Sequence, residues 1–229
     1  MKNIENLIVG TLNINSIRNK FDQLKHLIGN YIDILVLQET KVDDTFPEGQ
    51  FCIEGYLPPF RRDRNKYGGG IMIFIKEHIP AQLIKSTLPN DFECIFLELN
   101  FKNSKWLLFG AYKPPSQCSN FFFSEVTKAI TKLNSKYDNL LLLGDFNESV
   151  KDTILRNFMD DNTLKCLIKE PTCYKNPNNP SCIDLILTNQ SRKFKNSCVF
   201  DNGLSDFHRL VLTSFRFKFS PGAPKTSFL

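Results

Sequence analysis

Three carboxylates in this 229-residue chain lie in or directly after apolar runs, where an unpaired charge is costly. Glu39 follows one such run, Asp145 ends another, and Asp184 lies inside a third. A histidine, His208, comes just before the last apolar run of the chain. A buried carboxylate is tolerated when it is paired or when it binds a metal ion. The pattern therefore predicts that these carboxylates share cationic partners, either an imidazole or a metal ion.

Each of these residues also has an ordinary structural explanation when it is taken alone. Asp145 could cap the segment that follows it, and Asp184 could be a hydrogen-bonded core carboxylate. A single histidine such as His208 is more often structural than catalytic. The common position of these residues at strand ends, which Asn13 and Tyr112 share, favours one joint site instead.

Apolar runs bounded by turn residues predict strands, and helical spacing of apolar residues predicts helices between some of them. The predicted strands are 7–13, 32–38, 69–75, 95–101 (half-buried), 106–112, 139–145, 181–187 and 209–219. The predicted helices are 16–29, 121–137 and a short one at 153–159. Several strand pairs have no crossover helix between them, so the pattern favours one two-sheet α/β domain over a doubly wound parallel sheet.

The composition is that of a folded globular chain, with 41% hydrophobic and 23% charged residues. No run approaches the roughly 20 apolar residues of a membrane helix, and the N-terminus lacks a secretory pattern, so we expect no membrane association. The seven cysteines include no C-x-x-C pair, which favours a reducing compartment over a zinc or disulfide scaffold. The net charge of +5 permits an anionic partner without requiring one.

Seven short motifs between residues 11 and 208 follow one another in an order typical of a known superfamily. They are Thr11–Asn15, Gln38–Thr40, Gly68–Ile71, Ala111–Pro115, Gly144–Asn147, Ile183–Ile186 and Leu204–His208. On these motifs the chain resembles the exonuclease–endonuclease–phosphatase superfamily, and within it the apurinic-type endonuclease domain of non-LTR retrotransposons. The resemblance implies a single domain over residues 1–219, a two-sheet β-sandwich flanked by helices (four layers, αββα). We expect the tail, residues 220–229, to fray.

The resemblance also implies roles for individual residues. The implied metal ligands are Glu39, Asn13 and Asp206. The implied catalytic residues are Asp145, which orients or deprotonates the attacking water, Asn147 and Tyr112, which contact the phosphate, and the pair Asp184 and His208. The implied substrate-binding residues are Asn15, Arg18, Thr172 and Ser205. Oxygen ligands of this kind suit Mg²⁺, with Mn²⁺ as an alternative.

Two departures from the superfamily pattern affect these roles. Phe207 separates Asp206 from His208, which are usually adjacent. A regular strand would place Asp206 and His208 on one face, and a bulge at Phe207 would restore the usual geometry. Asn15 stands where relatives that repair abasic sites often carry an acidic residue, so a second metal contact there is disfavoured. The Phe207 insertion therefore weakens the implied metal role of Asp206 more than the implied role of His208.

The resemblance implies a metal-dependent DNA endonuclease that nicks one strand and leaves a 3′-hydroxyl for priming reverse transcription. The implied partners are double-stranded DNA and a reverse transcriptase domain of the same polyprotein, with the domain acting as a monomer in the nucleus. Two alternatives stay open, a superfamily phosphatase or exonuclease and a degenerate DNA-binding remnant. The polar loop 174–181 corresponds to a hairpin that, in the family, inserts into DNA and helps to choose the target. It is short here, so we expect loose sequence preference, and an inert surface turn is the alternative.

Overall fold

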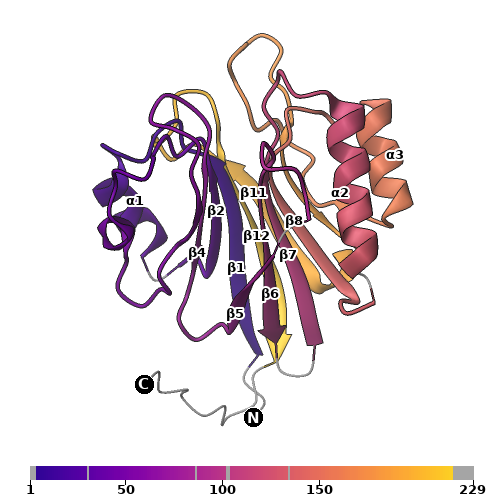
Figure 1. Ribbon diagram of the computed structural model, residues 1–229, viewed down its shortest axis with the longest axis horizontal. Helices are drawn as coiled ribbons and strands as arrows, with labels where there is room; N and C mark the ends of the chain where they lie inside the picture. The colour runs from indigo at the N-terminus through magenta and orange to yellow at the C-terminus, as the bar shows by residue number, and fades with distance from the viewer. Residues whose placement is uncertain (1–3, 30, 86, 102–103, 134, 219–229) are drawn as a thin grey trace.

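The computed structural model describes residues 4–29, 31–85, 87–101, 104–133 and 135–218, which form two six-stranded sheets packed between helices (Figure 1). The first sheet has the order β11–β12–β1–β2–β4–β3, with strands Phe194–Phe200, Leu210–Lys218, Ile4–Asn13, Ile34–Gln38, Ile71–Ile75 and Phe60–Arg62. The second has the order β5–β6–β7–β8–β10–β9, with strands Ala81–Ile84, Glu93–Phe101, Ser104–Tyr112, Asn139–Asp145, Asp184–Thr188 and Lys165–Cys166. The helices are α1 (Phe21–Ile28), α2 (Ser119–Leu133) and α3 (Thr153–Asp161).

The apolar side chains form three clusters, which correspond to the three interfaces between four layers. One cluster fills the space between the sheets and includes Val36, Leu108 and Val211. Two others lie on the outer faces, one beneath α1 and one beneath α2 and α3 (Figure 1). Both faces of the central strands are therefore buried, as continuous apolar runs predict.

The register of the central strands brings their polar ends to one edge of the sandwich. β1 pairs with β2 in parallel, with Asn13 opposite Gln38. β7 pairs with β8 in parallel, with Tyr112 opposite Asp145, and β10 runs antiparallel to β8, with Asp184 also opposite Asp145. Parallel neighbours end at the same edge, so these residues meet there although they are far apart in the sequence.

The predicted two-sheet α/β sandwich flanked by helices is confirmed, but several local predictions were wrong. The helix predicted over 16–29 begins at Phe21, because Asn15 and Ser16 have positive φ angles and the backbone N–H groups of Ser16 and Ile17 bond to the carbonyls of residues 39 and 40. Strand β6, predicted half-buried, is largely buried on both faces, because Phe96 packs in the cluster beneath α2 and α3. The short strands β3, β5 and β9 were missed, and so was β11, whose polar sequence shows no apolar alternation.

The remaining expectations lie partly outside the described residues. The predicted fraying of 220–229, and the end of the predicted strand at residue 219, fall there.

Among the helices that the structure describes, none has the length and apolar character needed to cross a membrane. All seven cysteines are unpaired.

Candidate active site

The alternation of side chains along the inner strands places acidic groups at the end of the inter-sheet layer, at the top of the sandwich in Figure 1. In β8, Leu143 faces the other sheet, so Asp145 two residues later has the same direction. In β10, Ile186 faces inward and Asp184 precedes it by two residues. Both carboxylates are almost fully buried, at 1% and 0% exposure. Their burial requires that each has polar partners.

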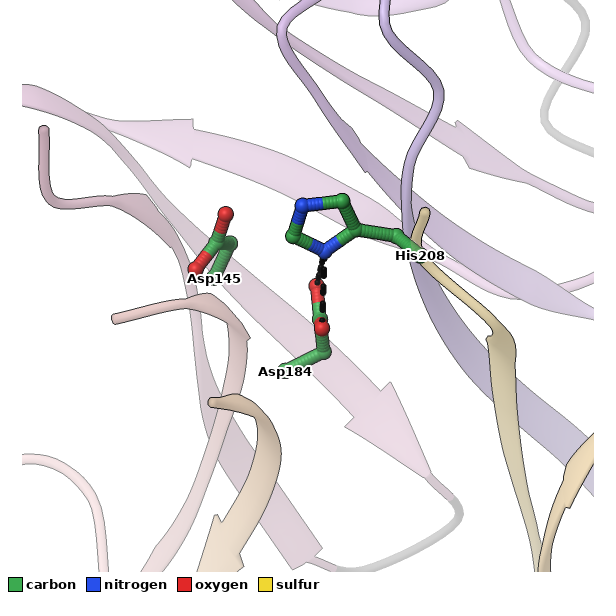
Figure 2. Close-up of side chains that lie close together, drawn as sticks. All are labelled: Asp145, Asp184 and His208. Atoms are coloured by element: carbon green, nitrogen blue, oxygen red, sulfur yellow. Dashed lines mark hydrogen bonds and ion pairs between the residues drawn. The ribbon is translucent and has the colours of Figure 1, made fainter. Parts of the chain in front are cut away.

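Asp184 and His208 form a close pair, in which the Asp184 side chain is fully buried and the His208 side chain is 14% exposed. The Nδ1 atom of His208 lies 3.0 and 2.9 Å from the two carboxylate oxygens of Asp184 (Figure 2). Burial opposes the charged form of His208, but the charge and the hydrogen bond of Asp184 outweigh it and raise the pKa of His208 to about 11. The imidazole therefore carries a positive charge at neutral pH. Phe207, 44% exposed, does not displace His208 from the site.

Asp145 lies beside the imidazole ring, next to Asp184 (Figure 2), and has a perturbed pKa. Burial, reinforced by the charge of Asp184, raises the pKa of Asp145 to about 7, although His208, Asn13 and Asn147 oppose the shift. Its Oδ2 accepts a hydrogen bond from Asn13 Nδ2 at 2.9 Å, and its Oδ1 accepts one from the Asn147 backbone N–H at 3.0 Å. Asp145 can therefore take up or release a proton near neutral pH.

Glu39 joins this cluster through shared donors. The Tyr112 hydroxyl donates to Glu39 Oε1 at 2.7 Å, and the Asn13 side-chain amide, which also bonds Asp145, lies 3.5 Å from the same oxygen. Burial disfavours the charge on Glu39, but hydrogen bonds from Tyr112, Asn13 and Lys41 and the Lys41 charge leave its pKa below the usual value. Burial and Glu39 raise the pKa of Tyr112, so the phenol stays protonated.

Asp206 lies apart from the cluster of Asp145, Asp184 and His208. Its Oδ2 accepts a hydrogen bond from Asn15 Nδ2 at 3.2 Å. The other side of the Asn15 amide, Oδ1, accepts a hydrogen bond from Lys41 Nζ, and that ammonium also lies 3.3 Å from Glu39 Oε2. Asn15 and Lys41 thus link Asp206 to Glu39 without direct contact between the two carboxylates.

The remaining predicted site residues fall into two groups. Thr172 and Ser205 are buried, and their hydroxyls hold the backbone of the site. Thr172 Oγ1 accepts the backbone N–H of Asp184 at 3.0 Å, and Ser205 Oγ accepts that of His208 at 3.4 Å. The structure therefore places Thr172 behind the site. Arg18 is exposed, and its guanidinium donates to Ser16 Oγ at 3.3 Å.

Asn147 has a backbone conformation that fits a position at the end of a strand. Its φ of 47° lies in the left-handed region, where asparagine is tolerated better than most residues. The side-chain amide donates to the carbonyl of Lys113 at 2.9 Å. The contact fixes the amide beside Asp145, whose Oδ1 accepts the Asn147 backbone N–H.

The sequence reasoning missed two residues of the site. Lys41 pairs with Glu39, and its position two residues after that carboxylate was the available signal. The Sγ atom of Cys173 lies 3.7 Å from His208 Nε2, the ring nitrogen that does not face Asp184. Nothing in the spacing of the cysteines indicated this contact, because 35 residues separate the two.

The donor set around Glu39 fits a hard divalent cation. Asp145, Asp184 and His208 also have ligand atoms within 4.8 Å of one another, but the latter two already neutralise each other. Glu39 instead offers carboxylate oxygens, which Mg²⁺ prefers, and the nearby Asn13 amide would add its oxygen only after turning, because its Oδ1 now accepts the Asn15 N–H at 3.2 Å. Glu39 is 24% exposed at its side chain, so solvent reaches it. The residues present are therefore compatible with a magnesium site at Glu39.

Solved structures with the same fold include several enzymes that act on DNA. An AP endonuclease from Leishmania major superposes with a TM-score of 0.76 at 14% identity, covering 92% of this chain and 88% of that one. The endonuclease domain of TRAS1, a telomere-specific non-LTR retrotransposon, superposes with a TM-score of 0.70 at 14% identity, covering 94% and 99%. A 3′ phosphatase from Neisseria, bound to a product DNA hairpin, superposes with a TM-score of 0.71 at 20% identity, covering 91% and 99%.

Sequence comparison identifies the family directly. No curated protein sequence matches this chain. The model of the Endonuclease/Exonuclease/phosphatase family, however, matches residues 10–206, which span all but the last two residues of the motifs identified above. The chain therefore belongs to the endonuclease/exonuclease/phosphatase family.

Proposed function

We propose that this protein is a metal-dependent DNA endonuclease that nicks one strand of double-stranded DNA and leaves a 3′-hydroxyl. The observation that carries the proposal is the convergence of Glu39, Asp145 and the Asp184–His208 pair at one edge of the sandwich. Phosphodiester hydrolysis needs a group that activates water and positive charge that stabilises the phosphate. The cluster contains both.

In this proposal Asp145 accepts the proton of the attacking water. Its pKa of about 7 suits a general base, because such a base works best when its pKa lies near the working pH. His208, charged at neutral pH, stabilises the negative charge that develops on the phosphate. Asn147 lies beside this pair and donates a hydrogen bond to the phosphate without adding negative charge. Tyr112 does the same once its single hydroxyl hydrogen turns from Glu39 to the phosphate.

Glu39, supported by Asn13, holds the Mg²⁺ ion, for which Mn²⁺ can substitute. The bound ion supplies Lewis-acid stabilisation of phosphoryl oxygen charge. Tyr112 and Lys41 keep Glu39 ionised and oriented in the protein without the ion. Asp206 supports this group from outside through Asn15, which is a weaker role than that of a direct ligand.

The TRAS1 endonuclease domain, which has this fold, supports a retrotransposon context. In that context the nick provides the primer for a reverse transcriptase domain of the same polyprotein, and the enzyme acts in the nucleus as a monomer. The Neisseria 3′ phosphatase supports a second candidate, removal of a 3′-phosphate from DNA. The two candidates share the phosphate chemistry and differ in whether an intact strand is cut.

A plasmid-nicking assay tests the proposal. Supercoiled plasmid incubated with Mg²⁺ should relax to the open circular form, and a DNA polymerase should extend from the nick because the new end is a 3′-hydroxyl. Nicks that a polymerase extends only after phosphatase treatment would contradict the proposed polarity. An oligonucleotide with a 3′-phosphate, assayed in parallel for phosphate release, distinguishes the second candidate.

Two matched variants give the assay a control. Glu39→Gln keeps the size of the side chain but removes the charge that holds the cation, so nicking should disappear. Glu125→Gln makes the same change in α2, away from the site, where the partly exposed carboxylate pairs with Lys128, and should nick like the wild type. Equal loss in both variants would indicate that the charge change acts through the fold.

A further inference from the structure

Cys173 and His208 approach each other on the side of the imidazole that Asp184 does not occupy. Cys173 is buried, with 5% exposure, and its Sγ lies 3.7 Å from His208 Nε2. The same ring is held at Nδ1 by Asp184, at 2.9 Å. A thiol and an imidazole nitrogen therefore point at one another in a position where both can bind a common ion.

The separation of these two atoms matches one edge of a tetrahedral zinc site. Zn–S bonds of about 2.3 Å and Zn–N bonds of about 2.0–2.1 Å at the tetrahedral angle give an S···N distance of about 3.6 Å. The observed 3.7 Å is close to this distance, and the direct contact between the thiol and Nε2 is what a bound ion would replace. Zinc-binding histidines also usually donate their second nitrogen to a carboxylate, as His208 does to Asp184.

The backbone holds both side chains in place. Cys173 forms isolated β-bridges with Ser181 and with His208. On either side of that bridge, the Tyr174 N–H donates to the carbonyl of Phe207 at 2.8 Å, and the Arg209 N–H donates to that of Thr172 at 2.8 Å. The two ligand atoms are thus preorganised, which lowers the entropic cost of binding an ion.

The net charge of the site can stay unchanged when a divalent cation binds. Asp145 and Asp184 are both buried beside the imidazole (Figure 2). When a divalent ion binds Sγ and Nε2, the S–H bond and the Nε2–H bond break, and two protons leave for solvent. The net charge of the cluster is then unchanged, so no uncompensated charge is buried.

We propose that Cys173 and His208 form an inhibitory site for a thiophilic divalent cation of the zinc class, separate from the magnesium site at Glu39. The binding part of this inference stands on the Cys173–His208 geometry alone. The inhibitory part rests on the proposed function, because a cation on Nε2 removes the nitrogen that would face the phosphate. Mg²⁺ does not compete for this site, because it binds sulfur and nitrogen poorly.

Binding is tested first, in metal-free protein without DNA. Cd²⁺ titration should produce a thiolate-to-metal absorption band whose tightest phase is lost in Cys173→Ser. The matched control, Cys198→Ser, removes an exposed thiol in β11 and should keep that phase. Equal spectra for the two variants would overturn the site. A second measurement uses the wild-type protein, so it does not depend on whether a variant folds. The ¹⁵N NMR signal of His208 Nε2 should shift when Zn²⁺ or Cd²⁺ is added. An unchanged signal would overturn the site.

Inhibition is tested second, by nicking in Mg²⁺ with added Zn²⁺. The Zn²⁺ concentration for half inhibition should rise at least about tenfold in Cys173→Ser and stay near the wild-type value in Cys198→Ser. A chelator should restore activity, whereas excess Mg²⁺ should not. Inhibition that excess Mg²⁺ relieves equally in both variants would place the ion at Glu39 and overturn the inhibitory role. Complete absence of Mg²⁺-dependent nicking would refute the proposed function, while the Cd²⁺ and ¹⁵N measurements would still decide the binding site.

Discussion

Asp184 and Glu39 are carboxylates of one site, but the protein holds them in different ways. The Asp184 side chain is fully buried and paired with His208, and its strand is fixed through Thr172. The Glu39 side chain is 24% exposed and is held by a hydroxyl, an amide and the exchangeable ammonium of Lys41. The Asp184 half is thus part of the core, whereas the Glu39 half is open to solvent and can change partners. We therefore expect changes at Glu39 to affect activity alone and changes around Asp184 to affect activity and stability together.

The largest effect should come from changing Glu39, the partly exposed carboxylate of the site. Glu39→Ala removes the main oxygen ligand of the proposed cation, so nicking should fall below detection. Because the side chain is partly exposed and contacts polar groups rather than the apolar core, thermal unfolding should occur close to the wild-type temperature. Circular dichroism melting and the plasmid assay measure the two quantities. Near-normal nicking at saturating Mg²⁺ would mean that another residue holds the ion.

A somewhat smaller loss of activity should come from changing the Asp184–His208 pair. His208→Ala should reduce nicking by a factor of about one hundred or more, the scale for losing an acid–base or charge-stabilising group. Asp184→Asn should also reduce nicking, and DNA binding should be largely retained in both variants. Nicking rates and a DNA-binding titration check this. A His208→Ala enzyme with the wild-type rate would leave Asp184 without its proposed role.

His208→Ala should also reduce stability, with a defined pH dependence. The pKa of His208 is raised from 6.5 to about 11 in the folded protein. A raised folded pKa means that the stabilising contribution is fully present below about pH 6.5 and is lost as the pH rises toward 11. The difference in stability between wild type and His208→Ala should therefore shrink over that range. Urea unfolding at several pH values measures it, and a constant difference would contradict the assigned pairing.

Asp145 should show an effect on stability at lower pH. Its pKa is raised from 3.8 to about 7, so folding is favoured by its protonated form, and stability should fall as the pH rises from about 4 through 7. Asp145→Asn cannot ionise and lacks this fall, although its altered hydrogen bonds add a constant offset. Urea unfolding of both proteins at pH 4 and pH 8 should show the variant gaining relative stability. A difference independent of pH would mean that Asp145 is not held near neutrality.

The smallest change in rate should come from the loop beyond the buried half. Residues 176–180 are largely exposed, and the backbone pairing of Cys173 with Ser181 closes the loop independently of its tip. Replacing Asn176–Pro180 by a Gly-Ser turn should leave the nicking rate within severalfold while changing the distribution of nicks. Sequencing the nick positions before and after replacement measures this. An unchanged distribution would identify the loop as an inert surface turn.

The sequence predicted local features better than features that depend on contacts between strands. Asp145 and Asp184 were identified because a carboxylate in an apolar run requires a partner, and that requirement is visible in a linear sequence. The helix start at Phe21 was not predicted, because it depends on hydrogen bonds from Ser16 and Ile17 to residues 39 and 40 on a neighbouring strand. Strand β11 was missed because pairing with β12, rather than apolar alternation, defines it.

The sequence by itself determined the family, the two-sheet α/β architecture and the set of polar residues at strand ends, because alternation, burial cost and motif order are local properties of the chain. Only the tertiary structure decided how these residues pair. The Cys173–His208 contact and the link from Glu39 through Lys41 and Asn15 to Asp206 join segments that different strands deliver to one edge. Such contacts depend on register and on side-chain direction at strand ends, where the regular alternation stops and linear spacing no longer indicates which groups meet.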